Sequence, residues 1–463
     1  MTEQLKLKLN DSKATRWGAL VIVAFTMMAA YYVNDVVAPL KTMLETDLAW
    51  SSTDFGFFTG GYSFLNVFFL MLIWGGLILD RFGIRFTGKL ATILMVGGTA
   101  LEYYAMTGLA GADATLFGIN EIFGYKTGVF VAFAGYSIFG VGAEVAGITV
   151  SKIIAKGFKG KELATAMGVQ VALARIGSQA GYAVAIPLAR AFGISTPVLL
   201  GLVLLLGGMI AFFVFTVMDK KLDKQMEAAA IAAGTEDEEE KFSFKDVKNI
   251  LVNPGFWLIA LLCVLFYSCV FPFQKFASEL MIIKYGINEN VAGTFAGLPA
   301  LGALILTPVF GGFIDKRGKS ASIMLLGSAM LICVHFIYAI PDINYWLVAI
   351  VLMIILGIAF SLVPSAMWPA VAKIFPVSQL GTAYALIFFI QNIGLWGIPT
   401  LIGWVLDAYC ISGKKPDGTN MYDYTVPMCI FTGIACLSLI VALLLKKADK
   451  KYGYKLEEPN IQK

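Results

Sequence analysis

Long apolar runs alternate with short polar connections along almost the whole chain. Twelve of these runs reach about 20 residues or more, which is the length an α-helix needs to cross a hydrocarbon layer of about 30 Å. They cover roughly residues 17–43, 52–79, 84–108, 127–157, 162–190, 195–218, 255–284, 290–314, 320–340, 344–374, 378–407 and 424–446. Each run ends near charged residues, glycine or proline. The pattern predicts an all-α membrane protein with twelve transmembrane helices.

The composition agrees with this pattern. Of the 463 residues, 58% are hydrophobic and only 14% are charged, whereas a soluble domain carries about 25% charged residues. Residues 1–17 are polar and basic and lack the short apolar core of a cleaved signal peptide. We therefore expect the first apolar run itself to direct insertion, and we expect membrane lipid to surround the folded chain.

Basic residues gather in alternate connections between the runs. These clusters comprise Arg81, Arg85 and Lys89, then Lys156, Lys159 and Lys161, then Lys316, Arg317 and Lys319, and finally Lys446, Lys447, Lys450 and Lys451. By the positive-inside rule the clusters face the cytoplasm, and both termini lie on that side as well. Because topology accounts for the basic residues, no nucleic-acid partner is expected.

One stretch near the middle of the chain reads as soluble. Residues 219–253 open with a helix-forming run, pass an acidic block at Glu236–Glu240 and end before Pro254, which suits the first turn of the next helix. We interpret the stretch as a solvated cytoplasmic linker. It divides the chain into an N-terminal six-helix bundle, 1–218, and a C-terminal six-helix bundle, 254–463.

The two halves share a motif at matching places. GGLILDRFGIR at 75–85 follows the second run, and GGFIDKRGK at 311–319 follows the eighth. Glycine lets two helices approach closely, the carboxylates suit a helix N-terminus or an arginine, and the basic residues suit the cytoplasmic face. The two loops resemble the loop 2–3 motif of the major facilitator superfamily and its weaker copy in loop 8–9.

This resemblance implies two pseudo-symmetric six-helix bundles and a secondary transporter that works by alternating access. It also implies gating or structural roles, rather than substrate contacts, for the charged residues of the two motifs. These residues are Asp80, Arg81, Arg85, Asp315 and Lys316.

Three segments resemble one branch of this superfamily more closely. They are FKGKELATAMGVQVALARIGS at 158–178, AMWPAVAKIFPVSQLGTAYALIFFIQNIGL at 366–395, and FGIR after the first motif aspartate. That branch transports dipeptides in lysosomes, so the resemblance implies a dipeptide or short-peptide transporter that works by facilitated diffusion as a monomer. The chain has no acidic dileucine signal near the N-terminus and no Asn-x-Ser/Thr sequon in an outer loop, which favours a prokaryotic inner membrane.

Two charged residues lie deep in neighbouring apolar runs. Glu144 lies about 13 residues from the end of its run, and Arg175 lies about 14 residues from the start of the next. At 1.5 Å per residue both are about 20 Å from the cytoplasmic face, close to the middle of the bilayer.

Two interpretations of this pair are open. One is a structural ion pair that fixes helix packing. The other is a substrate site, in which Arg175 binds the carboxylate and Glu144 the ammonium group of a zwitterionic dipeptide. The family resemblance implies the same two roles.

The second half offers candidates for the opposite wall of such a site. Gln391 and Asn392 lie about 14 residues into the eleventh run, where their amides suit a peptide bond or, equally, an interhelical hydrogen bond. Trp368 follows a proline at 364 and is a candidate for the wall or for packing. Further polar residues of the first two runs are candidates to line the outer half: Tyr31, Tyr32, Asn34, Asp35 and Tyr62.

Other polar residues are less informative. Lys275 and Glu279 lie four positions apart near the outer end of the seventh run, which fits either an i,i+4 ion pair or an outer gate. Glu102 is expected to be solvated near the outer interface, and His335, the single histidine, is expected in the core. Pairing of the two cysteines near the outer face, Cys410 and Cys429, is left open.

Other classes of function lack their residues. The sequence shows no paired carboxylates near a histidine, no nucleophile motif and no metal-ligand spacing, so we expect no enzyme, cofactor or metal. The alternative within transport is a proton-coupled carrier of an organic anion such as a sugar acid. There, Arg175 would bind the substrate and Glu144 would take up the proton.

Overall fold

The computed structural model describes residues 13–111, 114–158, 162–233 and 244–459. Twelve helices within these residues are long, and the shortest of them, α3, has 17 residues. They are α1 (Lys13–Val36), α3 (Ser52–Phe68), α4 (Met71–Thr107), α5 (Thr127–Phe158), α6 (Leu163–Phe192), α7 (Thr196–Ala233), α9 (Pro254–Tyr285), α11 (Leu298–Arg317), α12 (Ser320–Ala339), α13 (Trp346–Ile374), α14 (Val377–Tyr409) and α15 (Thr425–Tyr452).

Short elements connect these helices. They are the 3-10 helix η1 (Ala38–Leu40), the helices α2 (Lys41–Asp47), α8 (Phe244–Val252) and α10 (Glu289–Ala296), and the strands β1 (Glu121–Ile122), β2 (Tyr125–Lys126), β3 (Ile411–Lys414) and β4 (Asn420–Tyr422). β1 pairs antiparallel with β2, and β3 pairs antiparallel with β4. Among the described residues, nine helices are long and apolar enough to cross a membrane, and the bent pair α3 and α4 brings the number to ten.

The loop predicted between the second and third spans is a kink instead. α3 ends early, Leu70 takes a left-handed backbone, and α4 leaves at an angle of 58° to α3. Inside α4, Gly83 of the first motif has φ 73° and ψ 174°, a conformation that glycine reaches at no steric cost. The end of the second predicted span and all of the third therefore belong to one kinked helix.

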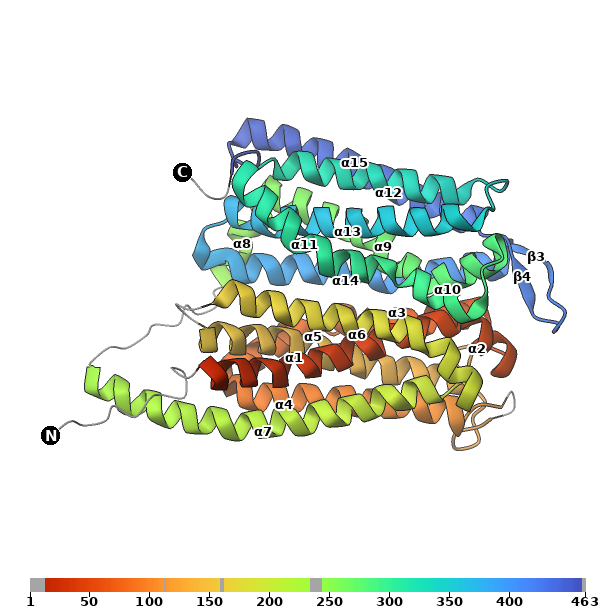
Figure 1. Cartoon of the computed structure of the whole chain (residues 1–463), viewed down its shortest axis with the longest axis horizontal. Helices are drawn as coiled ribbons and strands as arrows, with labels where there is room; N and C mark the ends of the chain where they lie inside the picture. Colours follow the sequence, from red (N-terminus) through yellow and green to blue (C-terminus); the bar gives the residue numbers. More distant parts are fainter. Residues whose placement is uncertain (1–12, 112–113, 159–161, 234–243, 460–463) are drawn as a thin grey trace.

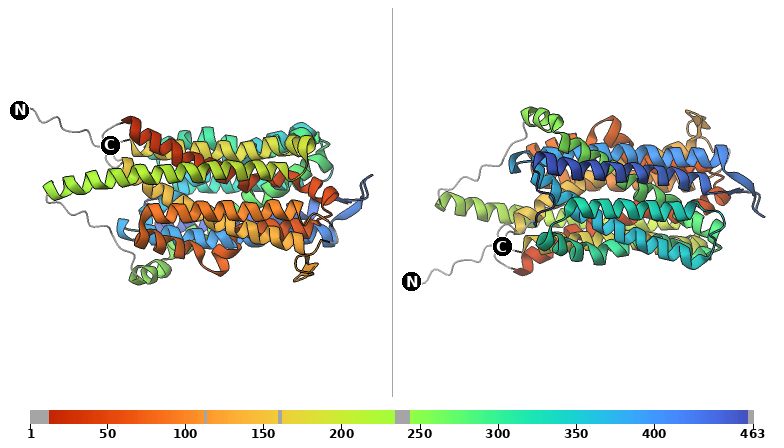
Figure 2. Two further views of the ribbon diagram at one scale, coloured as in Figure 1. Left: turned by 90° about the horizontal axis from the view of Figure 1, so that it is seen from below. Right: turned by 90° about the horizontal axis from the view of Figure 1, so that it is seen from above.

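The long helices form two groups that lie side by side (Figure 1). α1 and α3–α7 form the N-group, in which α3 packs on α5 and also closely on α14, and α9–α15 form the C-group. α1 begins and α15 ends at the same end of the molecule, which we name the terminal face, and the β3–β4 hairpin marks the opposite hairpin face. Figure 2 shows from two further directions that the long helices run between these faces.

The predicted linker is partly helical. α7 continues through 219–233 and extends past the other helices at the terminal face (Figures 1 and 2). α8 then packs beside α9 and α14. The acidic block Glu236–Glu240 lies outside the described residues.

The main contact between the two groups is the crossing of α3 and α14. A Cβ atom placed on Gly56 would lie 2.4 Å from the Pro399 carbonyl oxygen and 3.0 Å from the Cα atom of Gly403. The two backbones therefore touch at this crossing, which small residues make possible in membrane helices.

The structure corrects one expectation about a single residue. Glu102, expected to be solvated, is fully buried. The reason is close packing of α4 on α5, since a Cβ atom on Gly135 would lie 2.9 Å from the Glu102 backbone nitrogen. His335 is buried as expected, with Nε2 3.0 Å from the Cys269 carbonyl oxygen. All six cysteines are free.

The α3–α14 crossing generates a stability prediction. Gly56→Leu should lower the melting temperature of the purified protein, because the new side chain must push two backbones apart, at a cost of about 1–3 kcal/mol. Gly76→Leu is the matched control, since a Cβ atom at Gly76 meets nothing within 4 Å. Equal melting temperatures for the two variants would show that the crossing is not tight.

Candidate functional site

Arg175 lies in the middle of α6 with its guanidinium group between two aromatic rings. α6 packs closely on α1 nearby, where a Cβ atom on Gly177 would lie 2.1 Å from the Met28 carbonyl oxygen. This packing brings the Arg175 Cζ atom within 5.6 Å of the Tyr31 ring centroid, and it lies 4.8 Å from the ring of Phe360 in the C-group. The side chain is half-buried. Among the described residues it forms no ion pair. None of its nitrogen atoms is both buried and without a hydrogen-bond partner.

Glu144 lies on α5 and has a hydroxyl partner rather than a cation. A Cβ atom on Gly140 would lie 2.0 Å from the Tyr62 carbonyl oxygen, so α5 and α3 are in close contact one turn before Glu144. The Tyr62 hydroxyl donates to Glu144 Oε1 at 3.0 Å. The side chain is half-buried, and its second oxygen is not enclosed.

Glu144 and Arg175 share a neighbour but no direct bond. The charges of both residues act on the Tyr31 phenol, so both lie near it. No ion pair joins Glu144 to Arg175 among the described residues. The structure therefore does not contain the structural ion pair of the first interpretation. The two charges are part-exposed and separate, as groups that await a ligand would be.

Aromatic residues of the C-group face Arg175. The charge of Arg175 acts on Tyr267 of α9, and the Trp368 Nε1–H donates to the Tyr267 hydroxyl at 3.3 Å. The Trp368 ring stacks on Phe388 at 4.8 Å. Trp368 lies in a stretch of α13 that holds two prolines, at 364 and 369, each of which removes a backbone hydrogen bond from the helix.

Gln391 and Asn392 are placed differently from each other. Gln391 Oε1 accepts a weak bond from the Cys263 thiol at 3.4 Å, and its amide nitrogen is not enclosed. Asn392 donates to the Phe388 carbonyl of its own helix at 2.9 Å, and its Oδ1 atom is buried without a partner. Only Gln391 offers an accessible polar group.

The first motif forms contacts within the N-group at the terminal face. Asp80 and Lys152 form an exposed pair at 3.2 Å. Arg85 and Lys156 both pair with the buried Asp219 near the end of the apolar part of α7, at 3.4 and 3.1 Å. These ion pairs therefore join the motif to neighbouring helices of the N-group.

The remaining motif residues lie at the same face. Arg81 lies 5.5 Å from the Phe82 ring. In the second motif Lys316 is exposed, and Asp315 is part-exposed. None of the five charged motif residues lies beside the described contacts of Arg175 or Glu144.

At the hairpin face the two groups are joined by ion pairs. Lys275 of α9 pairs with Asp35 of α1 at 3.2 Å and also donates to the Asn34 carbonyl at 2.6 Å. The Ser178 hydroxyl donates to Asp35 as well. The i,i+4 pair between Lys275 and Glu279 is not formed, because Glu279 binds Lys41 of α2 at 2.5 Å.

Other residues at this face were missed in the sequence. Arg190 of α6 pairs with Glu289 of α10 and donates to Asn290 at 2.6 Å. The one signal in the sequence for these contacts was Lys41, a charged residue at the end of the first apolar run. Ion pairs between described residues of the two groups lie at the hairpin face, and they hold this face closed. We name the residues Asp35, Lys41, Lys275 and Glu279 the outer gate.

The different partners of these charges predict different effects on stability. Arg175→Gln should leave the melting temperature nearly unchanged, because no ion pair is lost. Lys275→Gln should lower it clearly, because breaking a mostly buried pair costs about 3–5 kcal/mol. Asp35→Asn combined with Lys275→Gln should recover part of the loss. A large drop for Arg175→Gln would instead indicate a structural partner.

Known proteins resemble this chain over most of its length. Residues 20–399 and 276–458 match the sequence profile of the Major Facilitator Superfamily. The human protein named lysosomal dipeptide transporter MFSD1 is 29% identical over 454 residues, which cover 95% of this chain and 88% of the human protein. The chicken protein of the same name is 32% identical over 287 residues, 59% of this chain and 62% of the chicken protein.

A solved structure shows the same fold. The crystal structure of the peptide transporter POT superimposes with a TM-score of 0.68 at 13% identity and covers 95% of each chain. The predicted all-α transmembrane fold with two six-helix bundles is thereby confirmed. The relatives are transporters by name, and so the protein described here is a transporter and not an enzyme, and it belongs to the major facilitator superfamily.

Proposed function

We propose that this protein moves dipeptides or short peptides across a membrane by alternating access, as facilitated diffusion. One observation carries the proposal. Glu144 and Arg175 are oppositely charged, part-exposed and central in the fold, and the described residues give neither of them an ion-pair partner. The relatives named as dipeptide transporters support the same class of substrate.

The chemistry of a free dipeptide suits these two charges. Its ends are an ammonium and a carboxylate several ångströms apart, so two separate groups are needed to hold it. Arg175 offers a planar fork of donors to the carboxylate, and Glu144 offers an anion to the ammonium. In a poorly hydrated site both contacts are stronger than in water.

The neighbouring groups suit the rest of a peptide. The amide of Gln391 is accessible for the peptide bond, while Asn392 is held within its own helix. Tyr31, Tyr62 and Trp368 offer amphipathic walls that accept side chains of different size. We therefore assign the substrate-binding role to Gln391, Tyr31, Tyr62 and Trp368, together with Glu144 and Arg175.

The closed hairpin face supports an alternating-access mechanism. With this face joined by ion pairs, substrate would enter or leave at the terminal face. The basic clusters of the two motifs lie at the terminal face, which supports its assignment to the cytoplasm. We propose a multi-pass protein of the cell inner membrane, monomeric, with both termini cytoplasmic.

The second candidate is a proton-coupled carrier of an organic anion such as a sugar acid. The observation that favours it is the single hydroxyl donor to Glu144 from Tyr62. A carboxyl group bound only by a hydroxyl is free to take up a proton. In that case Arg175 alone would bind the anion.

The dipeptide site is tested by removing each charge. Glu144→Gln and Arg175→Gln should each weaken dipeptide binding at least tenfold, since a charge-assisted contact contributes roughly 1.5–3 kcal/mol. The measurement is the shift in melting temperature on titration with a free dipeptide. Arg81→Gln and Glu121→Gln, both of exposed residues, are matched controls and should bind normally.

Blocked peptides assign each end of the substrate. Acetylation of the amine should remove the difference between the Glu144→Gln variant and the wild type, and amidation of the carboxylate should do the same for Arg175→Gln. A folded double variant, Glu144→Gln with Arg175→Gln, that still binds free dipeptide normally would refute the site. Binding of sugar acids but not dipeptides would favour the second candidate.

The mode of transport is tested in proteoliposomes. Dipeptide uptake should stop at equal inner and outer concentrations and should be unchanged by a protonophore, because the substrate amine occupies the Glu144 carboxylate. The readout is radiolabelled dipeptide at steady state, with and without an imposed pH gradient. Accumulation that collapses with the protonophore would establish proton coupling instead.

A further inference from the structure

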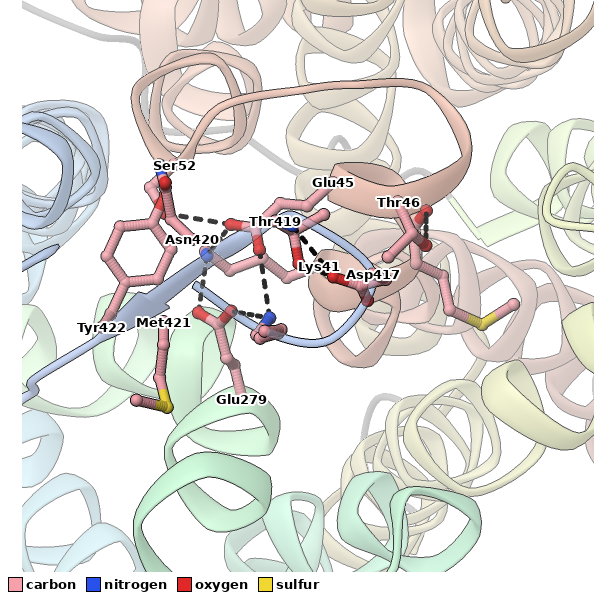
Figure 3. A network of polar contacts seen from close by, with 12 residues as sticks. Lys41, Glu45, Thr46, Ser52, Glu279, Asp417, Thr419, Asn420, Met421 and Tyr422 are labelled. Carbon is pink, nitrogen blue, oxygen red and sulfur yellow. Dashed lines mark hydrogen bonds and ion pairs between the residues drawn. The ribbon is translucent and has the colours of Figure 1, made fainter. Parts of the chain in front are cut away.

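Two residues of the outer gate, Lys41 and Glu279, belong to a closed ring of four charges. Lys41 binds Glu45 Oε1 and Glu279 Oε2, each at 2.5 Å. Lys415, in the turn of the β3–β4 hairpin, lies 3.5 Å from Glu45 Oε2 and 3.6 Å from Glu279 Oε1. Each carboxylate therefore faces both lysines, one with each oxygen. We name Lys41, Glu45, Glu279 and Lys415 the charge ring; Figure 3 shows the setting of its first three members.

The ring is sealed from solvent. The side chains of Lys41, Glu45, Glu279 and Lys415 are 1%, 5%, 0% and 14% exposed. Glu45 Oε2 and Glu279 Oε1 are buried and have no hydrogen-bond donor. Lys415 is thus the one described cation that faces these two oxygens.

The hairpin is held over the ring from both groups. The Tyr422 hydroxyl donates to Asp407 at 2.7 Å, and the same carboxylate accepts the backbone N–H of Ser52 at the start of α3 at 3.3 Å. The Tyr422 ring lies 4.8 Å from Lys41 Nζ. Tyr424 donates to Glu279, and burial raises the pKa of its hydroxyl well above the ordinary value, so it remains a donor.

The ring is neutral only with all four members. Lys41 alone cannot balance two buried carboxylates, and burying a net charge costs several kcal/mol. Without Lys415 the closed face would hold one excess negative charge away from water. When the face opens, water reaches the same groups and screens them.

Each half of the chain contributes one lysine and one glutamate to the charge ring. Lys41 and Glu45 belong to α2 of the first half, four residues apart, and Glu279 and Lys415 belong to the second half. Separation of the two groups therefore yields one neutral pair on each side. Such a division keeps the opening of the gate reversible.

We propose that Lys415 is a gate residue, and that the β3–β4 hairpin carries it so that the hairpin face closes only over a charge-balanced ring. The proposal rests on the alternating-access part of the proposed function and not on the identity of the substrate. Lys415 acts through Glu45 and Glu279, without touching the substrate.

The test measures opening of the hairpin face without substrate. Spin labels on cysteines at the exposed positions Asp47 and Asn344, in a background without the native cysteines, report the distance between the two groups by double electron–electron resonance. Lys415→Gln should raise the ratio of open to closed molecules by roughly tenfold, equivalent to about 1.4 kcal/mol. Lys415→Arg, which keeps the charge, should remain closed.

Restoring neutrality distinguishes charge balance from a merely structural role. Adding Glu45→Gln to Lys415→Gln should return the distance distribution to that of the wild type, since Lys41 then balances Glu279. The neighbouring Lys414→Gln is the matched control, because the exposed Lys414 donates to Asn420 and lies outside the charge ring. A closed distribution for Lys415→Gln, or an open one for the double variant with normal gel-filtration behaviour, would overturn the proposal.

Discussion

A charge inside a membrane protein needs either a counter-charge or access to water, and this constraint organises the whole structure. At the hairpin face every gate charge has a counter-charge on the other group, and the face is closed. In the centre, Glu144 and Arg175 have only hydroxyl and ring contacts and remain part-exposed. The same rule thus separates residues that hold the two groups together from the residues that we propose bind the substrate.

The packing of the helices lets this rule operate. At the crossing of α3 and α14, Gly56 and Gly403 bring two backbones into contact. In the proposed alternating-access mechanism, this close contact of small residues is the place where one group would turn against the other. The ion pairs at one face then decide in which direction the groups are tilted.

Much of this arrangement was readable from the sequence. The helices follow from the length of the apolar runs, and counting residues places Glu144 and Arg175 at one depth. The contacts of both residues agree with that depth, since each lies beside a tyrosine of the first two runs, Tyr62 and Tyr31 respectively.

What the sequence could not supply was the pairing of distant residues. Lys41 and Glu279 are 238 positions apart, so no local pattern links them. The spacing of Lys275 and Glu279 fitted either a pair on one helix or an outer gate, and in the structure each residue pairs across the interface instead. Glu102 looked solvated because residue counting gives depth and not direction, and its direction is set by the contact of α4 with α5.

In the proposed mechanism of facilitated diffusion, the contacts of Glu144 and Arg175 would let the protein return without substrate. Burial of an unpartnered guanidinium or carboxylate would be too costly to allow the empty protein to change its conformation quickly. Here the Tyr31 and Phe360 rings attract the Arg175 cation, and the Tyr62 hydroxyl supports the Glu144 anion. Such contacts each contribute on the order of 1 kcal/mol, less than a full ion pair. They are strong enough to reduce the penalty for the empty site and weak enough for the two ends of a dipeptide to replace them.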